Sequence, residues 1–463
     1  MTFETRLDAT RAYDNVHWIH PWENLGAAGQ QNRTIVTGGE GIYIHDETGR
    51  KLIDGPGGMW CVQVGYGNRE IAEAIYEQAL RMPYNNPFGT ASEPAALLAR
   101  KMAEIAPGDL DHVFFTTGGS TAVDSAVRFV HFYNNLKGRP AKKLIISRAD
   151  SYHGSTYLGA SISGKVGNKG QFDHDTTIVD FVGTTNPYRR PAGMSVAEFG
   201  EACVAELEQK ILEHGPERVG AFIAEPIQAS GGVIVAPEGY LRRARELCTK
   251  YDMIYISDEV VTGFGRCGHW FASKDMFGVE PDIITCAKGL TSGYQPLGAF
   301  ILSKRLYAEV TGENAKNSWF SNGFTYSGHP VACAAGLKNI EIIERTGLLE
   351  HVRKIAPQFQ ARLQGLRKIP IVGDVRGAGL VGCVECVASK DDTDPWNPRY
   401  PIGKVIDAHC VRHGLLVRPL LNMCVFSPPL IITPEQIDTM FDILETGVQA
   451  AMDQMVREGQ WRD

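Results

Sequence analysis

Short apolar runs alternate with helical patterns between about residue 70 and residue 330 of the chain. The runs are continuous and rich in β-branched and aromatic residues, which is typical of strands covered on both faces. We predict such strands at residues 112–116, 143–147, 220–224, 253–257, 282–286 and 299–303. Strands of this kind with helices between them indicate an α/β fold built on a mainly parallel sheet.

The pattern changes beyond residue 330, where the helical segments become longer. Helices are predicted between the strands at 120–133 and 198–214, and later at 331–344, 348–366 and 434–458, around strands at 380–386 and 415–418. We therefore predict a large domain over residues 66–330 and a smaller α+β domain over 331–463. The turn-rich segment 1–65 is expected to pack with the smaller domain, and the polar segment 389–401 to form a surface loop.

Composition limits the possible function classes. The chain has 463 residues, is 43% hydrophobic and carries a formal net charge of -7, as expected for a globular protein of about two or three domains. No basic patch, signal peptide or membrane-length apolar run stands out, so we expect no nucleic-acid or membrane partner and a cytoplasmic location. The ten cysteines lie in apolar contexts and are expected to be reduced and buried. Cys383 and Cys386 form a single CxxC, a spacing that we interpret as two core residues rather than a metal site.

Chemistry-bearing residues follow the predicted strands, at the sheet edge where open α/β sheets bind ligands. After 112–116 comes Thr-Gly-Gly-Ser-Thr, in which Gly119 and Ser120 open a helix whose first amides could bind an anion. A serine-capped turn that binds no ligand explains the same residues equally well. The loop lacks the glycine spacing of a dinucleotide fold and the lysine of a P-loop, which counts against a nicotinamide-linked oxidoreductase.

A carboxylate and a lysine follow two neighbouring predicted strands. Asp258 and Glu259 end one strand, and at least one of them should face inward because side chains alternate along a strand. An ion pair with Arg266 is one explanation of the inward carboxylate. Lys288 ends the next strand, so Asp258 and Lys288 could share one cleft with a flat cationic heterocycle between them.

Pyridoxal 5'-phosphate (PLP) has matching requirements. Its aldehyde needs a lysine amine, its ring nitrogen needs a carboxylate, and its phosphate needs a glycine-rich helix start. Lys288, Asp258 and the Gly119-Ser120 turn supply one of these each, from the ends of three strands. Together they predict a PLP site.

The chain resembles the class III, fold type I PLP-dependent aminotransferases of the ω-amino acid and amine:pyruvate branch. The resemblance rests on TTGGSTAVDSAVR, SYHGST, AFIAEPIQASGG, ISDEVVTGFGRCG, DIITCAKGL, GFTYSGHP and LLVRPL, in family order over nearly the whole chain. It implies a seven-stranded, mainly parallel sheet in the large domain. It also implies that Lys288 forms the Schiff base and moves the proton, that Asp258 pairs with the ring nitrogen, and that Gly119 and Ser120 hold the phosphate.

More site residues are implied by the resemblance alone. Tyr152 and Val261 would contact the two faces of the cofactor ring, with His153 and Glu225 supporting the pocket. Phe324 and Thr325 would reach the phosphate of a neighbouring subunit, which implies a homodimer with shared sites and leaves a tetramer open. Substrate contacts are expected from Arg418, which would clamp a carboxylate, and from Trp60, Ser230, Tyr152 and, across the dimer, Phe88. Taken singly, Tyr152 would more often be a core aromatic residue than a stacking residue, and Arg418 next to Pro419 could cap a surface strand instead.

Three departures favour pyruvate as the acceptor. Relatives that use glutamate-family keto acids have an acidic residue where this chain has Ser230, an arginine where it has Ser155, and often a glutamine at the position of Val261. The predicted reaction is a ping-pong transfer of an amino group from a primary amine or ω-amino acid to pyruvate. An aminomutase, a phospholyase and a non-catalytic PLP-binding protein remain as alternatives, and the physiological donor stays open.

Overall fold

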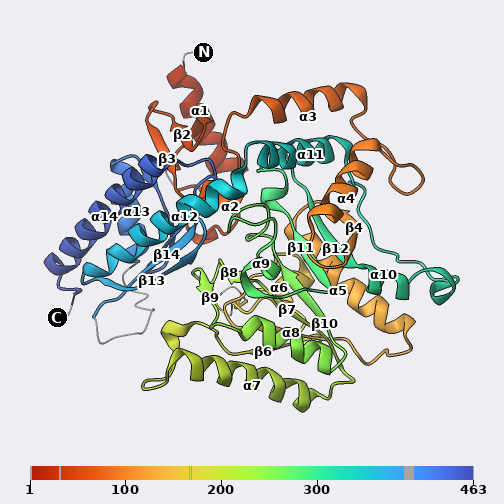
Figure 1. The fold of residues 1–463 in the computed structure, drawn as a ribbon. Coiled ribbons are helices and arrows are strands. Elements are labelled where there is room, and N and C mark those ends of the chain that lie inside the picture. The colour runs from red at the N-terminus through yellow and green to blue at the C-terminus, as the bar shows by residue number, and fades with distance from the viewer. Residues whose placement is uncertain (1–2, 31–32, 166, 168, 390–400, 462–463) are drawn as a thin grey trace.

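The structure is a computed structural model that describes residues 3–30, 33–165, 167, 169–389 and 401–461 (Figure 1). Most of the loop predicted at 389–401 therefore lies outside the described residues. Among the described residues, no helix is both long and apolar enough to cross a membrane.

A seven-stranded sheet forms the centre of the larger part of the chain. Its strand order is β4 (Leu110–Thr116), β12 (Gly298–Ser303), β11 (Ile283–Cys286), β10 (Ile254–Asp258), β7 (Val219–Ala224), β5 (Leu144–Arg148) and β6 (Val179–Val182). Only β12 runs against its neighbours among these strands; the other pairs that touch are parallel. The six predicted strands are confirmed within one or two residues at each end, and β6 was not predicted.

Helices cover both faces of this sheet. Helix α5 (Gly119–Leu136) packs on one face through a cluster that includes Val127, Ile223 and Ile256. On the opposite face, α7 (Val196–His214) and α8 (Tyr240–Lys250) lie over β5 and β7, and α4 (Glu93–Ile105) and α11 (Pro330–Arg345) lie over the β4 end. The remaining helices of this part are α3 (Arg69–Arg81), α6 (Tyr157–Ile162), α9 (Ala272–Phe277) and α10 (Lys304–Glu309).

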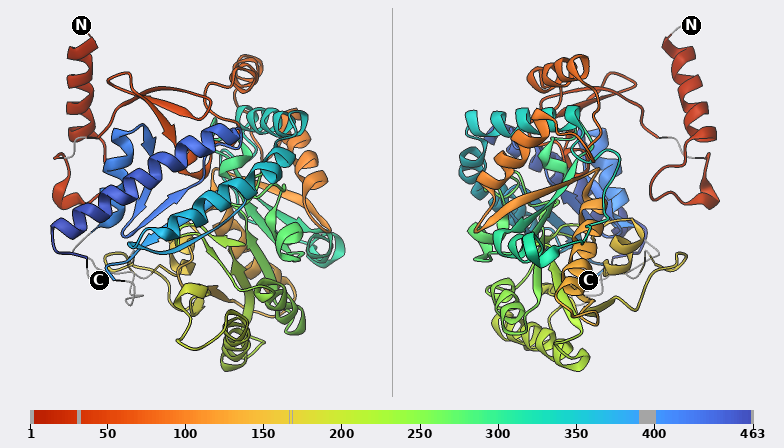
Figure 2. Two further views of the ribbon diagram at one scale, coloured as in Figure 1. Left: turned by 60° about the vertical axis from the view of Figure 1, so that its left-hand side comes forward. Right: turned by 90° about the vertical axis from the view of Figure 1, so that its right-hand side faces the viewer.

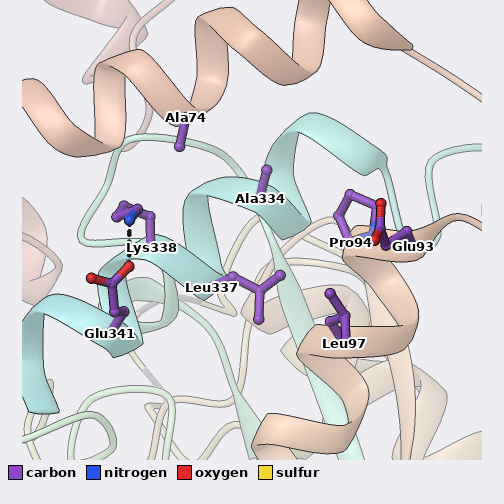
Figure 3. A pocket seen from close by; sticks show the side chains of 8 residues that line it. All are labelled: Ala74, Glu93, Pro94, Leu97, Ala334, Leu337, Lys338 and Glu341. Carbon is purple, nitrogen blue, oxygen red and sulfur yellow. Dashed lines mark hydrogen bonds and ion pairs between the residues drawn. The ribbon is translucent and has the colours of Figure 1, made fainter.

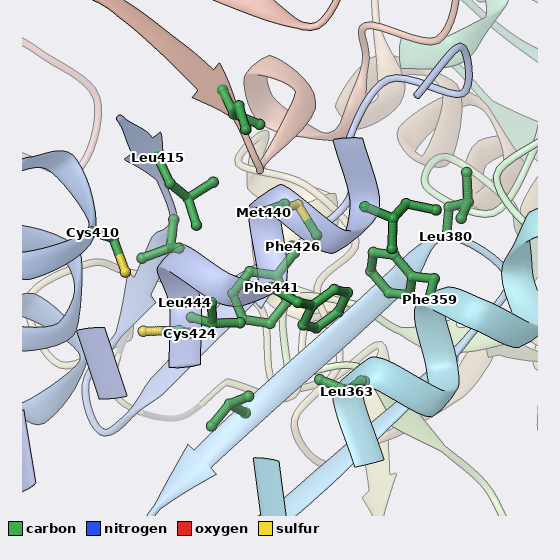
Figure 4. Close-up of a cluster of buried hydrophobic side chains, with 14 of the residues drawn as sticks. Phe359, Leu363, Leu380, Cys410, Leu415, Cys424, Phe426, Met440, Phe441 and Leu444 are labelled. Atoms are coloured by element: carbon green, nitrogen blue, oxygen red, sulfur yellow. The ribbon is translucent and has the colours of Figure 1, made fainter. Parts of the chain in front are cut away.

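The C-terminal part is built on a four-stranded antiparallel sheet. Its order is β13 (Val372–Ala378), β14 (Val381–Cys386), β17 (Met423–Phe426) and β16 (Arg418–Leu420), with α12 (Leu348–Gly365), α13 (Ile402–Arg412) and α14 (Pro434–Arg457) beside it. Phe359, Phe426 and Phe441 meet in its core, with the Phe359 and Phe441 rings 5.1 Å apart edge to face (Figure 4).

The N-terminal segment joins this part through a second four-stranded sheet. Strands β1 (Val36–Glu40), β2 (Tyr43–Asp46) and β3 (Lys51–Asp54) form a meander, and β15 (Leu415–Leu416) pairs in parallel with β3. Ile42 and Ile53 belong to the same buried cluster as Phe441. The segment also contains a helix that we did not predict, α1 (Phe3–His17), which stands at the periphery of the molecule in Figure 2.

The strand predicted at 415–418 is interrupted in the structure. Residues on either side of Val417 pair with different sheets, because β15 bonds to β3 whereas β16 bonds to β17. The Val417 N–H instead donates to the Asp407 carboxylate at 3.2 Å. The break places Arg418 where the N-terminal and C-terminal sheets meet.

The Phe441 packing gives a stability prediction. Phe441 is fully buried, so Phe441→Ala should leave a cavity and destabilise the protein by about 3–5 kcal/mol. Urea unfolding of the purified protein should show a clearly lower midpoint. Leu212→Ala is the control, because Leu212 is 57% exposed on α7 and its loss should cost under about 0.5 kcal/mol. Equal midpoints for the two variants would contradict the packing.

Candidate active site

Lys288 and Asp258 lie at the same edge of the central sheet. Asp258 is the last residue of β10 and pairs in parallel register with Thr285 of β11. Lys288 follows β11 at the start of a short 3₁₀ helix, Lys288–Leu290, with a left-handed φ of 45°. Two side chains from adjacent parallel strands therefore meet where open α/β sheets bind ligands.

The Asp258 carboxylate is buried and held by a histidine. His153 Nδ1 lies 2.7 Å from Asp258 Oδ2, and the two side chains are 0% and 4% exposed. The Val260 N–H donates to Asp258 Oδ1 at 3.2 Å. His153 was predicted to be a hydrogen-bonded supporting residue, and the structure shows that its partner is Asp258.

The explanation of these carboxylates by an Arg266 ion pair is wrong. Glu259 accepts hydrogen bonds from the Thr262 hydroxyl and from the Ala272 and Ser273 N–H groups. Arg266 instead donates to the carbonyl oxygens of Leu380 and Pro428 and to Gln63 Oε1. The arginine therefore joins separate backbone segments, and Glu259 caps the start of α9.

The Lys288 amine is held in a water-poor environment. Burial lowers the pKa of Lys288, although the nearby Asp258 carboxylate acts in the opposite direction. Its Nζ lies 5.7 Å from the centre of the Trp60 ring and makes no hydrogen bond to the described residues. A lysine with a lowered pKa and a free amine is suited to attack an aldehyde.

The N-terminus of α5 is open to an anion. Its N-cap is Gly118, which supplies no side-chain hydrogen bond to the first turn of this 18-residue helix. The Ser155 N–H donates to Ser120 Oγ at 3.1 Å. A Cβ at Gly119 would lie 3.0 Å from the Val260 side chain, and one at Gly154 would lie 2.8 Å from the Ser120 backbone. Glycine at both positions keeps these close approaches possible, and the free amides suit a phosphate.

Glu225, Tyr152 and Val261 lie around the same edge. The Tyr152 N–H donates to Glu225 Oε1 at 3.0 Å, and burial raises the pKa of the Glu225 carboxyl. The Tyr152 hydroxyl is 2.8 Å from Ser155 Oγ, and its ring centre is 6.1 Å from that of Trp22. Val261 is buried in a cluster that also contains Trp60.

Trp60, Ser230 and Arg418 are three of the residues that were expected to contact the substrate. The Arg418 guanidinium carbon lies 4.3 Å from the centre of the Trp60 ring, and Ser230 is buried. Among the described residues, no carboxylate forms an ion pair with Arg418. Burial lowers the pKa of Arg418, so this cation is only partly compensated.

Phe88, Phe324 and Thr325 form a separate group on the surface. Phe88 is 75% exposed, Thr325 is also exposed, and Gly323 next to Phe324 lies against the Phe88 ring. The Tyr84 hydroxyl donates to the Thr325 carbonyl at 3.1 Å. Within the described residues, no hydrogen bond or ring contact links this group to Lys288, Asp258 or Arg418.

Two supporting residues of the site were not predicted. Asp54 accepts hydrogen bonds from the Gly58 N–H and the Tyr66 hydroxyl, both at 2.5 Å, and so shapes the turn that carries Trp60. Arg376 donates to the Gly232 carbonyl at 2.7 Å and pairs with Glu385 at 2.7 Å, holding the loop that contains Ser230. The position of Asp54 directly before a glycine-rich turn could have indicated its role in the sequence. No sequence pattern indicated the role of Arg376.

A second hollow on the surface, away from this sheet edge, lacks a comparable set of residues. A hollow of about 320 Å³ lies between α3, α4 and α11, lined by Leu97, Leu337 and the Lys338–Glu341 ion pair (Figure 3). Over the described residues, no group of three or more His, Cys, Asp and Glu side chains could hold a metal. Cys383 and Cys386 are both buried on β14.

The residues at the sheet edge fit PLP. A partly desolvated lysine, a buried carboxylate and an uncapped helix start match its aldehyde, ring nitrogen and phosphate. The buried His153 Nε2 and Trp60 Nε1 atoms lack hydrogen-bond partners in the described structure, which leaves polar groups for a ligand beside Asp258 and Lys288.

Comparisons with known proteins agree with this chemistry. The family model for class III aminotransferases matches residues 25–448. A putrescine–pyruvate aminotransferase of Pseudomonas aeruginosa is 41% identical over 94% of each chain, and a diaminobutyrate–2-oxoglutarate transaminase of Halomonas elongata is 38% identical over 94% of each. The crystal structure of an omega transaminase from Pseudomonas jessenii in complex with PMP is 35% identical, with a TM-score of 0.92 over 95% of this chain and 98% of that one. The chain therefore belongs to the class III aminotransferase family, whose members depend on PLP.

Proposed function

We propose that this enzyme transfers an amino group from a primary amine or ω-amino acid to pyruvate, giving an aldehyde or ketone and alanine. The observation that carries the proposal is that Lys288 and Asp258 share one edge of the central sheet while Arg418, from β16, lies near enough to act on the Lys288 charge and has no acidic partner among the described residues. The family resemblance implies that relatives using glutamate-family keto acids have an acidic residue where this chain has Ser230. The related P. aeruginosa enzyme is named for pyruvate, whereas the H. elongata enzyme is named for 2-oxoglutarate.

Each residue has a specific part in the proposed reaction. When bound, PLP supplies an electron sink for the charge left on the donor carbon. Asp258, kept in place by His153, would hold the ring nitrogen. Lys288 Nζ would hold the cofactor through its aldehyde, and as a free amine it would take the proton from the donor carbon.

Binding and orientation come from the residues around this pair. Gly119 and Ser120 present the first amides of α5 to the phosphate. Tyr152 and Val261 restrain the two faces of the ring, with Glu225 fixing the backbone at Tyr152. Arg418 binds the carboxylate of the keto acid in a two-pronged contact, and Ser230 leaves room for it.

A homodimer is part of the proposal. Phe88, Phe324 and Thr325 are grouped on the surface of one chain, away from its own Lys288. We infer that they complete the site of a second copy, with Thr325 at the phosphate and Phe88 at the amine donor. We likewise propose that segment 1–65 and residues 331–463 form one smaller domain, since β3 and β15 share a sheet.

The proposal is tested by spectroscopy and product analysis. The purified protein should be yellow, lose its visible band when a primary amine is added and regain it with pyruvate. Alanine should form in a one-to-one ratio with the carbonyl product. Release of phosphate from a phosphorylated amine, or isomerisation without alanine, would instead establish a phospholyase or an aminomutase. A stable yellow band that no amine changes would indicate a non-catalytic PLP-binding protein.

Lys288→Ala should abolish turnover while the protein stays folded. Loss of a positioned base alone costs about 10²- to 10⁴-fold, and the covalent link to the cofactor is lost as well. The measurement is alanine formation together with far-UV circular dichroism and the visible spectrum. Lys354→Ala is the control, because Lys354 is an exposed residue of α12. Near-normal activity of Lys288→Ala would reject the assignment.

Arg418→Ala should distinguish substrates that carry a carboxylate from those that do not. Loss of a charge-assisted contact should lower kcat/KM for pyruvate and β-alanine roughly 10- to 100-fold, and affect propylamine much less. The matched control is Arg345→Ala, which removes a surface arginine paired with Glu70. Equal losses for β-alanine and propylamine would show that Arg418 has only a structural role.

The lowered pKa of Lys288 predicts unusual reactivity towards acylating reagents. In the folded, cofactor-free protein, the Lys288 amine should become reactive at a lower pH than the same lysine in urea, because burial favours its neutral form. Trace acetylation between about pH 6 and pH 11, followed by peptide mass spectrometry, gives both profiles. A folded-state midpoint at or above the urea value would contradict the prediction.

A further inference from the structure

Trp60 contacts Arg418 through its ring face. The guanidinium carbon lies 4.3 Å from the ring centre, which is within the range of a cation–π interaction. Trp60 is only 2% exposed, so the contact is shielded from water. Its indole N–H has no hydrogen-bond partner in the described structure, so packing and the ring face, not that N–H, hold the side chain.

The surroundings of Arg418 make this contact energetically important. Arg418 is partly buried, and a guanidinium that has lost part of its hydration is costly unless an anion or another favourable group compensates it. Over the described residues no carboxylate pairs with Arg418, and the neighbouring charges of Lys165 and Lys288 repel it. The Trp60 ring face, 4.3 Å from the guanidinium carbon, is therefore a compensating contact, and Tyr152 nearby also favours the charged form.

The backbone at Trp60 is built to present this ring. Trp60 has a left-handed φ of 62°, as do Gly57 and Gly58 with values of 59° and 68°. Asp54 secures the turn through the Gly58 N–H. The turn is packed against the C-terminal part, because a Cβ at Gly57 would lie 2.4 Å from the Ser427 carbonyl oxygen. A substitution at Trp60 therefore changes the ring while the turn keeps its other contacts.

We propose that Trp60 is a positioning residue that holds Arg418 inside the pocket and thereby sets the affinity for substrates that bear a carboxylate. Arg418 is held against the ring, and no acid among the described residues pairs with it, so an arriving carboxylate meets a preordered partner. Without the ring, the guanidinium loses this favourable contact and turns towards water. This inference rests on the proposed function, and it adds a role for Trp60 beyond contact with the amine donor.

The kinetic test compares pyruvate with propanal, an acceptor without a carboxylate. Trp60→Leu should lower the ratio of kcat/KM for pyruvate to kcat/KM for propanal roughly 2- to 30-fold, the range of a cation–π contact. Trp60→Phe, which keeps an aromatic face, should lower the ratio less. In an Arg418→Leu background, Trp60→Leu should leave the ratio as it was, because the partner is already absent. Equal losses for both acceptors, or a loss that persists without Arg418, would overturn the proposal.

A binding measurement separates this inference from the proposed reaction. In the holoenzyme labelled with ¹⁵N at its indole groups, the Trp60 signal is identified by its loss in Trp60→Phe. It should shift when propionate is added and stay in place when 1-propanol is added. Arg418→Leu should abolish the shift. A shift that persists in Arg418→Leu, or none in the unmodified holoenzyme, overturns the role of Trp60. Because no turnover is needed, these outcomes hold even if the amino transfer itself is disproved.

Discussion

The hydrogen bond between Asp258 and His153 is the interaction on which the active site depends. A carboxylate that is 4% exposed has lost most of its contact with water, and such burial is costly unless a polar partner is hydrogen-bonded to it. The 2.7 Å contact with His153 supplies that partner. The backbone at Asp258 is fixed by the pairing of β10 with β11. Lys288, one strand away on β11, is thereby next to a carboxyl group whose position is fixed.

The sequence predicted the sheet well because its strands are buried on both faces. An apolar run that stops at Asp258 or at Lys288 marks a strand end, and parallel strands bring such ends together. The same reasoning overlooked β6, which is only four residues long, and α1, which buries little apolar surface. It also read 415–418 as one strand, because periodicity does not reveal that the Val417 N–H bonds to a side chain of α13.

The supporting contacts of the site were harder to predict for a different reason. Trp60 and Arg418 are far apart in sequence, and neither residue type specifies the other as its partner. Arg376 acts through a carbonyl oxygen of the Ser230 loop, a contact that any sequence could make. The predicted ion pair of Arg266 was wrong for the same reason. Its acceptors are mostly backbone carbonyl oxygens, which every residue type has and which a sequence therefore does not reveal.

The backbone at Lys288 has an evolutionary consequence. A non-glycine residue at a φ of 45° costs on the order of 1–2 kcal/mol relative to ordinary conformations, and glycine would adopt it without that cost. Folding alone therefore favours glycine over lysine here, whereas the chemistry that we propose for this position requires the lysine amine. A descendant of this chain that abandoned catalysis for some other task should drift towards glycine or asparagine at this position early, while the surrounding apolar strands persist.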